Sequence, residues 1–209
     1  MVMKIKTVKY FSKRNAFSQT DSRSLMILLF IFASAMIIGA GTAGKSDTFI
    51  SSQMGGYVSD AFDYCVKSGF VKVFFYSFII NALLILFAFV NGFNCIGLPL
   101  SVVLPAIKGI GLGLISGSMY TAGSSGVIRY CMTILPGGIF AVLALILACN
   151  ESAYMSVDIL SLILNRRETS DNISIKKYSV KFLIILLIVF ISSIIDSITL
   201  VGIGHYLSV

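Results

Sequence analysis

Two ionisable side chains, Lys108 and Asp196, lie inside long apolar stretches of the sequence. A charged residue at the centre of a membrane helix costs about 2.5–3.5 kcal/mol on insertion scales, so such residues pair, face water or serve a function. If a helix begins after Pro105, Lys108 could instead extend its ammonium group to the membrane surface. Because each residue is an isolated charge in its stretch, we hypothesise that Lys108 and Asp196 form an ion pair inside a helix bundle.

The sequence contains no recognised set of catalytic residues. An intramembrane protease needs an acid pair, a Ser/His pair or a metal motif within the bilayer, and the apolar stretches offer only Lys108 and Asp196. The GxSxG, HExxH and Walker A motifs are absent. The one histidine, His205, lies in the C-terminal tail, and no two of the four cysteines form a CxxC pair. We therefore expect no enzymatic activity, no cofactor and no metal site.

The composition indicates a membrane protein. Of the 209 residues, 57% are hydrophobic and only 12% are charged, whereas soluble domains have about 45–50% apolar and about 25% charged residues. The charges are clustered and leave stretches of about 20 residues, which is the length that crosses the ~30 Å hydrocarbon core as a helix. The sequence predicts an all-α integral membrane protein in which residues 1–209 form a single domain.

Five stretches have the length and hydropathy of transmembrane helices. They are residues 25–43, 72–91, 96–120, 127–149 and 182–203. The first could be a signal peptide, but its apolar run exceeds the 7–15 residues typical of one, and the basic segment before it is long. We expect an uncleaved anchor and about five spans.

Proline and glycine interrupt the third and fourth stretches. Pro99 and Pro105 each remove a backbone donor from the third, and Pro136 is followed by Gly137 and Gly138 in the fourth. Such residues break or kink helices, and an interruption at mid-span often gives two half-helices. The pattern predicts that some of the five helices are broken or kinked.

A stripe of small residues follows in the third stretch. Gly109, Gly113 and Gly117 recur at four-residue spacing. This spacing places them on one face of a helix, where small residues let another helix approach closely. The stripe predicts helix packing, either within the chain or in a homo-oligomer.

Two segments outside the spans have an amphipathic pattern. Residues 151–167 predict an interfacial helix that lies on the membrane surface. The segment 45–71 has an apolar residue at every fourth position, which makes one stripe on a helix. That stripe would pack on the membrane or on the bundle itself, or form a docking face for a partner outside the cell; its residues are Ile50, Met54, Val58, Phe62 and Val66.

The basic residues predict the topology. The net charge is +7, and Lys and Arg cluster in residues 1–23 and in residues 166–181, next to spans. Basic segments that flank spans stay in the cytoplasm and contact lipid headgroups. The N-terminus, with its basic segment 1–23, is therefore expected inside and the C-terminus outside. Because no soluble domain presents a basic face, we expect membrane lipids and no nucleic acid as the partner of these charges.

Several short blocks lie in order along the apolar stretches. They are Ile96-Gly97-Leu98-Pro99, Ile107-Lys108-Gly109-Ile110 with Gly113, Ile134-Leu135-Pro136, and Ser192-Ser193 with Asp196. In order and spacing, these blocks resemble the stage II sporulation protein M family of endospore-forming bacteria. One difference is that Gly137 and Gly138 follow Pro136, where the wider family often has His-Gly, so no ionisable group is transferred to that position.

The resemblance implies a role in sporulation. Proteins of this kind are similar to the membrane anchor of a complex with two peptidoglycan-degrading enzymes, stage II sporulation proteins D and P. That complex remodels the septal wall so that the mother-cell membrane can engulf the forespore. The resemblance thus implies a non-enzymatic scaffold in the mother-cell membrane at the sporulation septum. Two alternatives remain: a membrane subunit of a small transporter or permease, indicated by the interrupted spans and intramembrane charges, and a structural membrane protein of an unrelated pathway.

Overall fold

The computed structural model of the chain describes residues 22–44, 69–94, 97–121, 123–163 and 175–203, and it contains helices and no strand in this part of the chain. Six α-helices are followed by one π-helical segment, η2. Their bounds are α1 Ser22–Gly44, α3 Phe70–Asn91, α4 Gly97–Thr121, α5 Ser124–Thr133, α6 Leu135–Ile163, α7 Ile175–Ile198 and η2 Thr199–Ile203.

Five of the helical segments in the described residues are long and apolar enough to cross a membrane, which confirms the predicted all-α fold with about five spans. Helices are the expected form, because the hydrocarbon interior offers no water to backbone groups and a helix pairs them within itself. The segments are Arg23–Ala43, Phe70–Asn91, Gly97–Thr121, Leu135–Leu160 and Ile175–Gly202.

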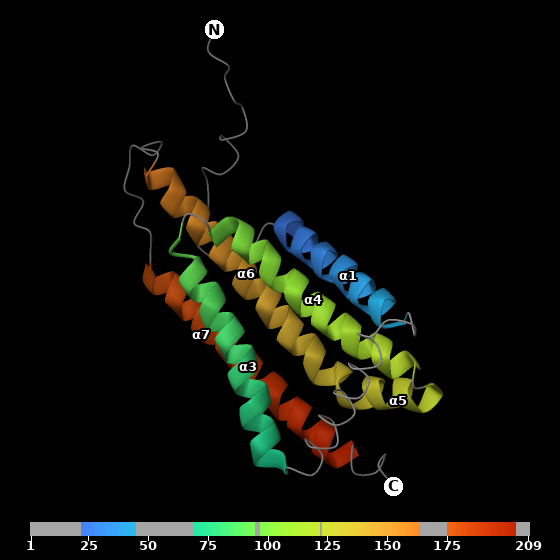
Figure 1. Cartoon of the computed structure of the whole chain (residues 1–209). Helices are drawn as coiled ribbons and strands as arrows, with labels where there is room; N and C mark the ends of the chain where they lie inside the picture. The colour runs from blue at the N-terminus through green and yellow to red at the C-terminus, as the bar shows by residue number, and fades with distance from the viewer. Residues whose placement is uncertain (1–21, 45–68, 95–96, 122, 164–174, 204–209) are drawn as a thin grey trace.

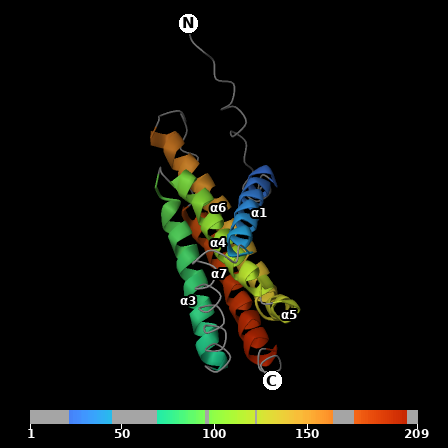
Figure 2. The same ribbon diagram turned by 45° about the vertical axis from the view of Figure 1, so that its right-hand side comes forward.

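Helix α6 lies at the centre of the bundle and contacts α1, α3, α4, α5 and α7. Figures 1 and 2 show α1 lying along α4 on one side of α6, and α3 lying beside α7 on the other. Successive spans run in opposite directions, so α1, α4 and α7 begin where α3 and α6 end. We call this the basic end, because the exposed side chains of Arg23, Lys176, Lys177 and Lys181 lie there.

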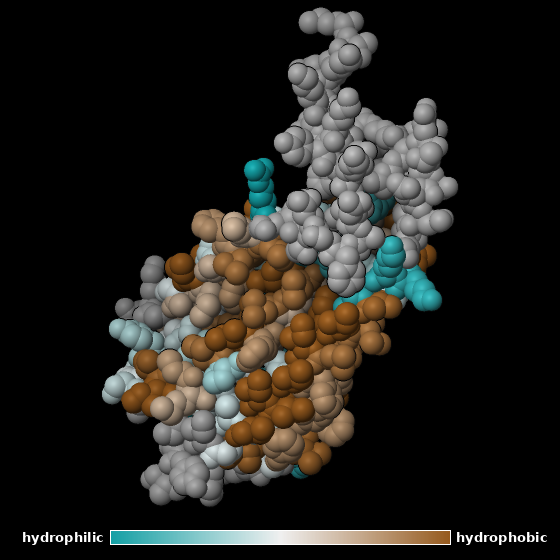
Figure 3. All heavy atoms as spheres, turned by 180° about the vertical axis from the view of Figure 1, so that it is seen from behind, coloured by the Kyte–Doolittle hydropathy of each residue, from teal (hydrophilic) through white to brown (hydrophobic). Residues whose placement is uncertain are grey.

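The buried core draws on all five spans, with Leu28, Ile85, Leu104, Leu145 and Val189 as members. Many large apolar side chains are exposed outside this core, Phe30 for example by 73%. Figure 3 shows these hydrophobic residues as a broad belt, with hydrophilic residues gathered at the basic end. Such a belt is the surface that a bundle presents to lipid.

Aromatic rings join α3 to α7 along much of their length. The ring centroids of Phe74 and Phe190 lie 5.3 Å apart, and those of Phe89 and Tyr178 lie 5.1 Å apart. These separations fall in the range at which aromatic pairs attract one another. The α3–α7 contact is therefore made mainly by large side chains.

The contact between α1 and α4 is made by small residues instead. Gly109, Gly113 and Gly117 are buried against α1, and a Cβ atom at any of them would overlap its backbone. At Gly109 that atom would lie 2.6 Å from the Phe32 carbonyl oxygen, and at Gly117 2.7 Å from that of Ala40. The glycine stripe therefore packs within this chain and lets the two helices approach at backbone distance.

The third span is one continuous helix, so the break expected at its prolines is not present. Pro99 is the third residue of α4, where the first turn has no helical partner for a backbone N–H. Pro105 lies inside α4 and is buried. Burial in the bundle holds α4 together across the proline, as membrane helices often tolerate.

The predicted fourth span, residues 127–149, is divided between two helices, and the continuous apolar helix of this region lies further along the chain. Ile134 separates α5 from α6, and Pro136 is the second residue of α6, where it helps to start a helix. The span is therefore Leu135–Leu160 and not 127–149.

An interfacial helix at 151–167 was the wrong interpretation, because residues 151–163 continue α6, and residues 164–167 lie outside the described part. The polar residues that made this segment look amphipathic face the interior of the bundle. Asn150, Ser152 and Ser156 are each 1% exposed or less. The last span begins at Ile175, seven residues before the predicted start, and its lysines extend toward the basic end.

The glycine stripe yields a first prediction. Replacing Gly113 with Ala places a methyl group against the Met36 carbonyl oxygen of α1, so we expect a loss of about 1–3 kcal/mol from overpacking. Gly111, two residues away in α4, has nothing within 4 Å of the position that an alanine methyl group would take. There, Ala should stabilise the helix by up to about 1 kcal/mol.

Reversible unfolding of both variants in mixed detergent micelles measures this difference in free energy. Equal effects of Gly113→Ala and Gly111→Ala would contradict the close approach of α1 to α4.

Candidate functional site

A chain of hydrogen bonds crosses the bundle from α4 through α3 to α7. The Lys108 ammonium donates to Asn81 Oδ1 at 3.0 Å. Asn81 Nδ2 donates to the Ser77 backbone carbonyl at 3.0 Å, and the Ser77 hydroxyl donates to Asp196 Oδ2 at 2.7 Å. We call these four residues the polar chain. It satisfies both intramembrane charges with partners from a helix that carries no charge of its own at this depth.

Lys108 and Asp196 do not touch, so the hypothesis of a direct ion pair is replaced by a connection through α3. Their opposite charges still compensate one another, since Coulomb attraction is strong where water is scarce. Lys108 also gains a hydrogen bond to Asn81, and Asp196 gains one from Ser77. A direct ion pair would not have used these two side chains of α3. The arrangement ties three helices together, where an ion pair would tie two.

Sequence reasoning missed Ser77 and Asn81. Both lie in the apolar run 72–91, which was interpreted only as a span. A signal was present, because they are four residues apart and therefore share one helix face. Polar residues on one face of a span bond across helices, and this rule would have identified α3 as the partner of the charges.

The carboxylate of Asp196 packs against the start of α6. A Cβ atom at Gly137 would overlap that carboxylate, so only glycine fits between α6 and α7 here. The Ser192 hydroxyl donates to the Gly137 carbonyl at 2.8 Å, and the Thr199 hydroxyl donates to the Thr133 carbonyl at 2.8 Å. Helix α7 and η2 thus supply donors to backbone carbonyls on both sides of the α5–α6 interruption, and the Thr133 carbonyl lies at the end of α5, where carbonyls lack partners within the helix.

A second polar layer lies at the basic end. The Ser24 hydroxyl donates to Asn150 Oδ1 at 2.6 Å and shares a 2.6 Å hydrogen bond with the Tyr154 hydroxyl, which joins α1 to α6. Lys181 of α7 forms a 2.8 Å ion pair with Glu151 of α6. Asn150 Nδ2 is buried and has no hydrogen-bond partner in the described structure.

Further bonds in this layer join the end of α3 to α6 and α7. The Ser156 hydroxyl of α6 donates to the Asn94 carbonyl at 2.8 Å, just after α3. The Tyr178 hydroxyl of α7 donates to the Phe89 carbonyl at 2.9 Å. The polar groups of this layer therefore serve contacts between spans.

The remaining predicted residues fall in three groups. The helix-packing residues Gly109, Gly113 and Gly117 contact α1, whereas Pro99, Pro105 and Pro136 lie in continuous helix or at a helix start. The apolar stripe Ile50, Met54, Val58, Phe62 and Val66 lies outside the described residues. Among the described residues, no group of three or more His, Cys, Asp or Glu side chains is placed to hold a metal ion.

The polar chain holds helices together through hydrogen bonds. Its carboxylate accepts from Ser77 and its ammonium donates to Asn81, so both charged groups are engaged by neighbouring helices. Three apolar grooves lie elsewhere, along α1, α4, α5, α6 and α7, and neither Lys108 nor Asp196 lines them. The polar chain acts as a junction of α3, α4 and α7.

Comparison with protein families adds one decisive observation. The family model described as Stage II sporulation protein M matches residues 28–198, from α1 to the end of α7. The chain belongs to the stage II sporulation protein M family. Neither the curated proteins nor the solved structures compared with it gave a match.

The stage II sporulation protein M match spans the glycine stripe and all four residues of the polar chain. Family membership and the five apolar helices together identify a sporulation-related, multi-pass membrane protein. The stage II sporulation protein M family is not known as a catalytic family.

The polar chain yields a second prediction. Asn81→Leu removes the acceptor of the Lys108 ammonium, and we expect a loss of about 1–2 kcal/mol, at the upper end for hydrogen bonds between membrane helices. In a Lys108→Met background the same change should cost much less, because no charge is then left without its partner. Unfolding free energies of the four proteins in this cycle measure the coupling.

Ser34→Ala is the control for removing a polar side chain from a span, because the Ser34 hydroxyl donates to the Ile31 carbonyl of its own helix. We expect it to be close to neutral. Additive effects of Asn81→Leu and Lys108→Met would refute the polar chain.

Adjacent glycines at the start of α6 yield a third prediction. Gly137→Ala forces the Asp196 carboxylate away from its place beside Ser77, and we expect a loss of about 1–3 kcal/mol. Gly138 has nothing within 4 Å of the corresponding position, so Gly138→Ala should be neutral or stabilising by up to about 1 kcal/mol. The melting temperatures of the two purified variants distinguish these outcomes, and equal values would show that Asp196 does not pack on Gly137.

Proposed function

We propose that this protein is a non-enzymatic membrane scaffold that assembles and localises peptidoglycan-degrading enzymes for remodelling of the septal wall during forespore engulfment. Its expected partners are stage II sporulation proteins D and P. Its expected place is the mother-cell membrane at the sporulation septum. The observation that carries the proposal is membership of the stage II sporulation protein M family across residues 28–198.

The distribution of polar groups supports a scaffold. Lys108 and Asp196 are committed to hydrogen bonds with α3, and the polar layer at the basic end joins neighbouring spans. Groups used in this way fix the relative positions of the helices. A bundle of fixed shape suits a protein whose task is to hold partners at one place in the membrane.

The positive-inside rule supports the orientation of the scaffold. The basic end, which adjoins the segment 1–23, is expected in the cytoplasm. The segment 45–71 then lies outside, on the side of the membrane where peptidoglycan is found. The stripe Ile50, Met54, Val58, Phe62 and Val66 in this segment is the proposed contact for the wall enzymes.

One observation favours the transporter alternative. The α5–α6 interruption lies beside Asp196, and interrupted helices next to an intramembrane charge are common in transporters. The family match across residues 28–198 supports the scaffold, and no comparable match supports a transporter. We therefore place the scaffold first.

A crosslinking pull-down of the tagged protein from sporulating cells, read by mass spectrometry, tests the proposal. We expect to recover two wall-degrading enzymes. Phe62→Ser should reduce that recovery severalfold, because it removes an aromatic group from the proposed contact. Tyr64→Ser is the matched control, since Tyr64 lies two residues away and off the apolar stripe by helical spacing.

Two results would contradict the scaffold. Recovery without wall-degrading enzymes would remove its partners, and a preparation dominated by an ATPase subunit would favour the transporter. Equal losses in Phe62→Ser and Tyr64→Ser would contradict the placement of the contact on the stripe, while leaving the scaffold itself intact.

A further inference from the structure

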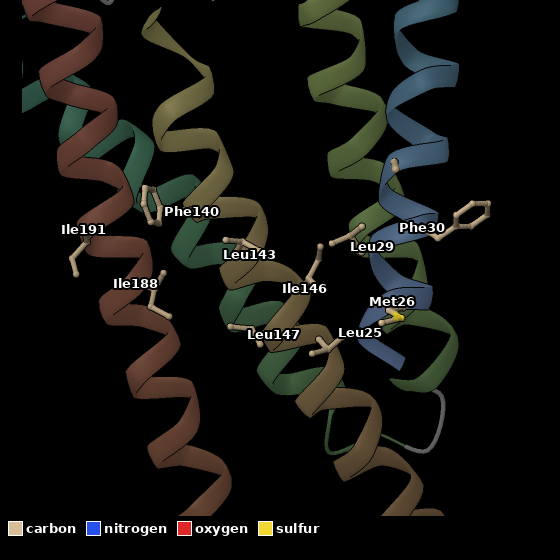
Figure 4. A pocket seen from close by; sticks show the side chains of 11 residues that line it. Leu25, Met26, Leu29, Phe30, Phe140, Leu143, Ile146, Leu147, Ile188 and Ile191 are labelled. Atoms are coloured by element: carbon tan, nitrogen blue, oxygen red, sulfur yellow. The ribbon is translucent and has the colours of Figure 1, made fainter. Parts of the chain in front are cut away.

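A groove of about 690 Å³ runs between α1 and α7, with α6 as its floor. Figure 4 shows its walls: Leu25, Met26, Leu29 and Phe30 come from α1, and Ile188 and Ile191 come from α7, with side chains of α6 between them. The lining is almost entirely apolar. The groove therefore lies in the hydrocarbon region and opens on the lipid-facing surface.

The groove exists because α1 is held by α4. The glycine stripe draws α1 close to α4, and the Ser24–Asn150 bond ties it to α6 only near its start. No comparable contact joins α1 to α7 in the described residues. A gap along the outer side of α6 follows from this packing, and in a membrane something apolar must fill it.

The walls and the location of the groove indicate its occupant. Aliphatic and aromatic side chains line it, and it opens on the lipid-facing surface. A flexible acyl chain suits an apolar slot of this kind, and the headgroup attached to it would lie at the membrane surface, where basic residues attract anionic lipids.

The charges at the basic end indicate the headgroup. On α7, Lys181 precedes Ile188 by seven residues, or two helical turns, so it lies on the groove-facing side toward that end. On α1, Arg23 precedes Phe30 by the same seven residues. Basic side chains flank the mouth of the groove on both walls, and such positions attract anionic lipid headgroups.

The other groups at this mouth come mainly from α6. Glu151 forms the ion pair with Lys181, and Asp158 lies about two turns further along α6. Lys177 of α7 is a further basic group on the Lys181 side. Asn150, three residues after Leu147 of the groove floor, is buried and does not line the groove.

We propose that the groove between α1 and α7 binds one acyl chain of an anionic phospholipid, whose phosphate lies at the basic end between Arg23 and Lys181. The acyl chain fills the apolar slot over α6. The phosphate provides negative charge to Arg23 and Lys181. This site is independent of the proposed scaffold role.

Tryptophan fluorescence tests the site without background, because the chain contains no tryptophan. Phe30→Trp places the probe in the groove, and Leu83→Trp places it on the exposed face of α3, away from the groove. Phe30 is eight residues from the start of α1, and Leu83 is eight residues from the end of α3, so both probes lie at a similar depth from the basic end. The protein is reconstituted with phosphatidylglycerol or phosphatidylcholine carrying brominated acyl chains, which quench tryptophan on contact.

We expect brominated phosphatidylglycerol to bind next to Phe30→Trp at least about fivefold more tightly than brominated phosphatidylcholine. At Leu83→Trp the two lipids should bind almost equally. Adding Arg23→Gln and Lys181→Gln to the groove probe should reduce the preference, by about fivefold for each charge removed. Lys72→Gln, at the start of α3 and at the opposite end of the bundle, should leave the preference unchanged.

Three results would overturn the proposal. Equal preferences at the two probes would show ordinary lipid contact without a site. Absence of quenching by either lipid at Phe30→Trp would show that protein, such as a second copy or a partner helix, fills the groove. A preference that survives both Gln substitutions would refute the placement of the phosphate. Unchanged melting temperatures of the variants establish that each reading comes from the folded protein.

Discussion

The hydrocarbon interior of a membrane offers no water to a polar group, so each such group in the bundle needs a partner from the protein. The polar chain meets this requirement for Lys108 and Asp196, which are joined through Asn81 and Ser77 of α3. Because the four residues come from three helices, the same bonds that satisfy the charges also set the positions of α3, α4 and α7. Gly137 completes the arrangement, since its lack of a side chain lets α6 lie against the Asp196 carboxylate.

The second constraint is the backbone contact between α1 and α4. Dispersion between closely packed surfaces is a main source of helix association in lipid, where the hydrophobic effect does not favour one apolar neighbour over another. The glycine stripe of α4 makes that contact, and it leaves α1 separated from α7 by the width of the groove. The bundle thus has two differently built halves: α3 and α7 are joined by large aromatic rings, and α1 and α4 by glycines. The groove lies where the two halves meet over α6.

Hydropathy correctly predicted about five membrane spans, and residue spacing correctly predicted the glycine face of α4. Both features depend on local sequence alone. The errors concern partners. Pro105 was expected to break or kink its helix, and the structure shows no break, because burial among neighbouring spans holds α4 together. Ser152 and Ser156 belong to the segment that was interpreted as a surface helix, whereas they bond inside the bundle to Ser101 of α4 and to the Asn94 carbonyl just after α3. Lys108 and Asp196 were recognised as a set, but Ser77 and Asn81 between them were overlooked in the apolar run 72–91, although their four-residue spacing places both on one helix face.

These packing features bear on how a protein of the stage II sporulation protein M family could act as a scaffold. A scaffold must present its binding surfaces at fixed positions, and here the intramembrane polar groups are used to fix helices. The soluble domains of partners would then bind the segments at the two ends of the bundle. Membrane-embedded groups would bind the apolar sides of the bundle. The groove over α6 lies on such an apolar side, and basic residues lie at one of its ends. A lipid bound there would join α1 to α7, which have no extensive contact with each other among the described helices, so that the membrane itself would complete the bundle.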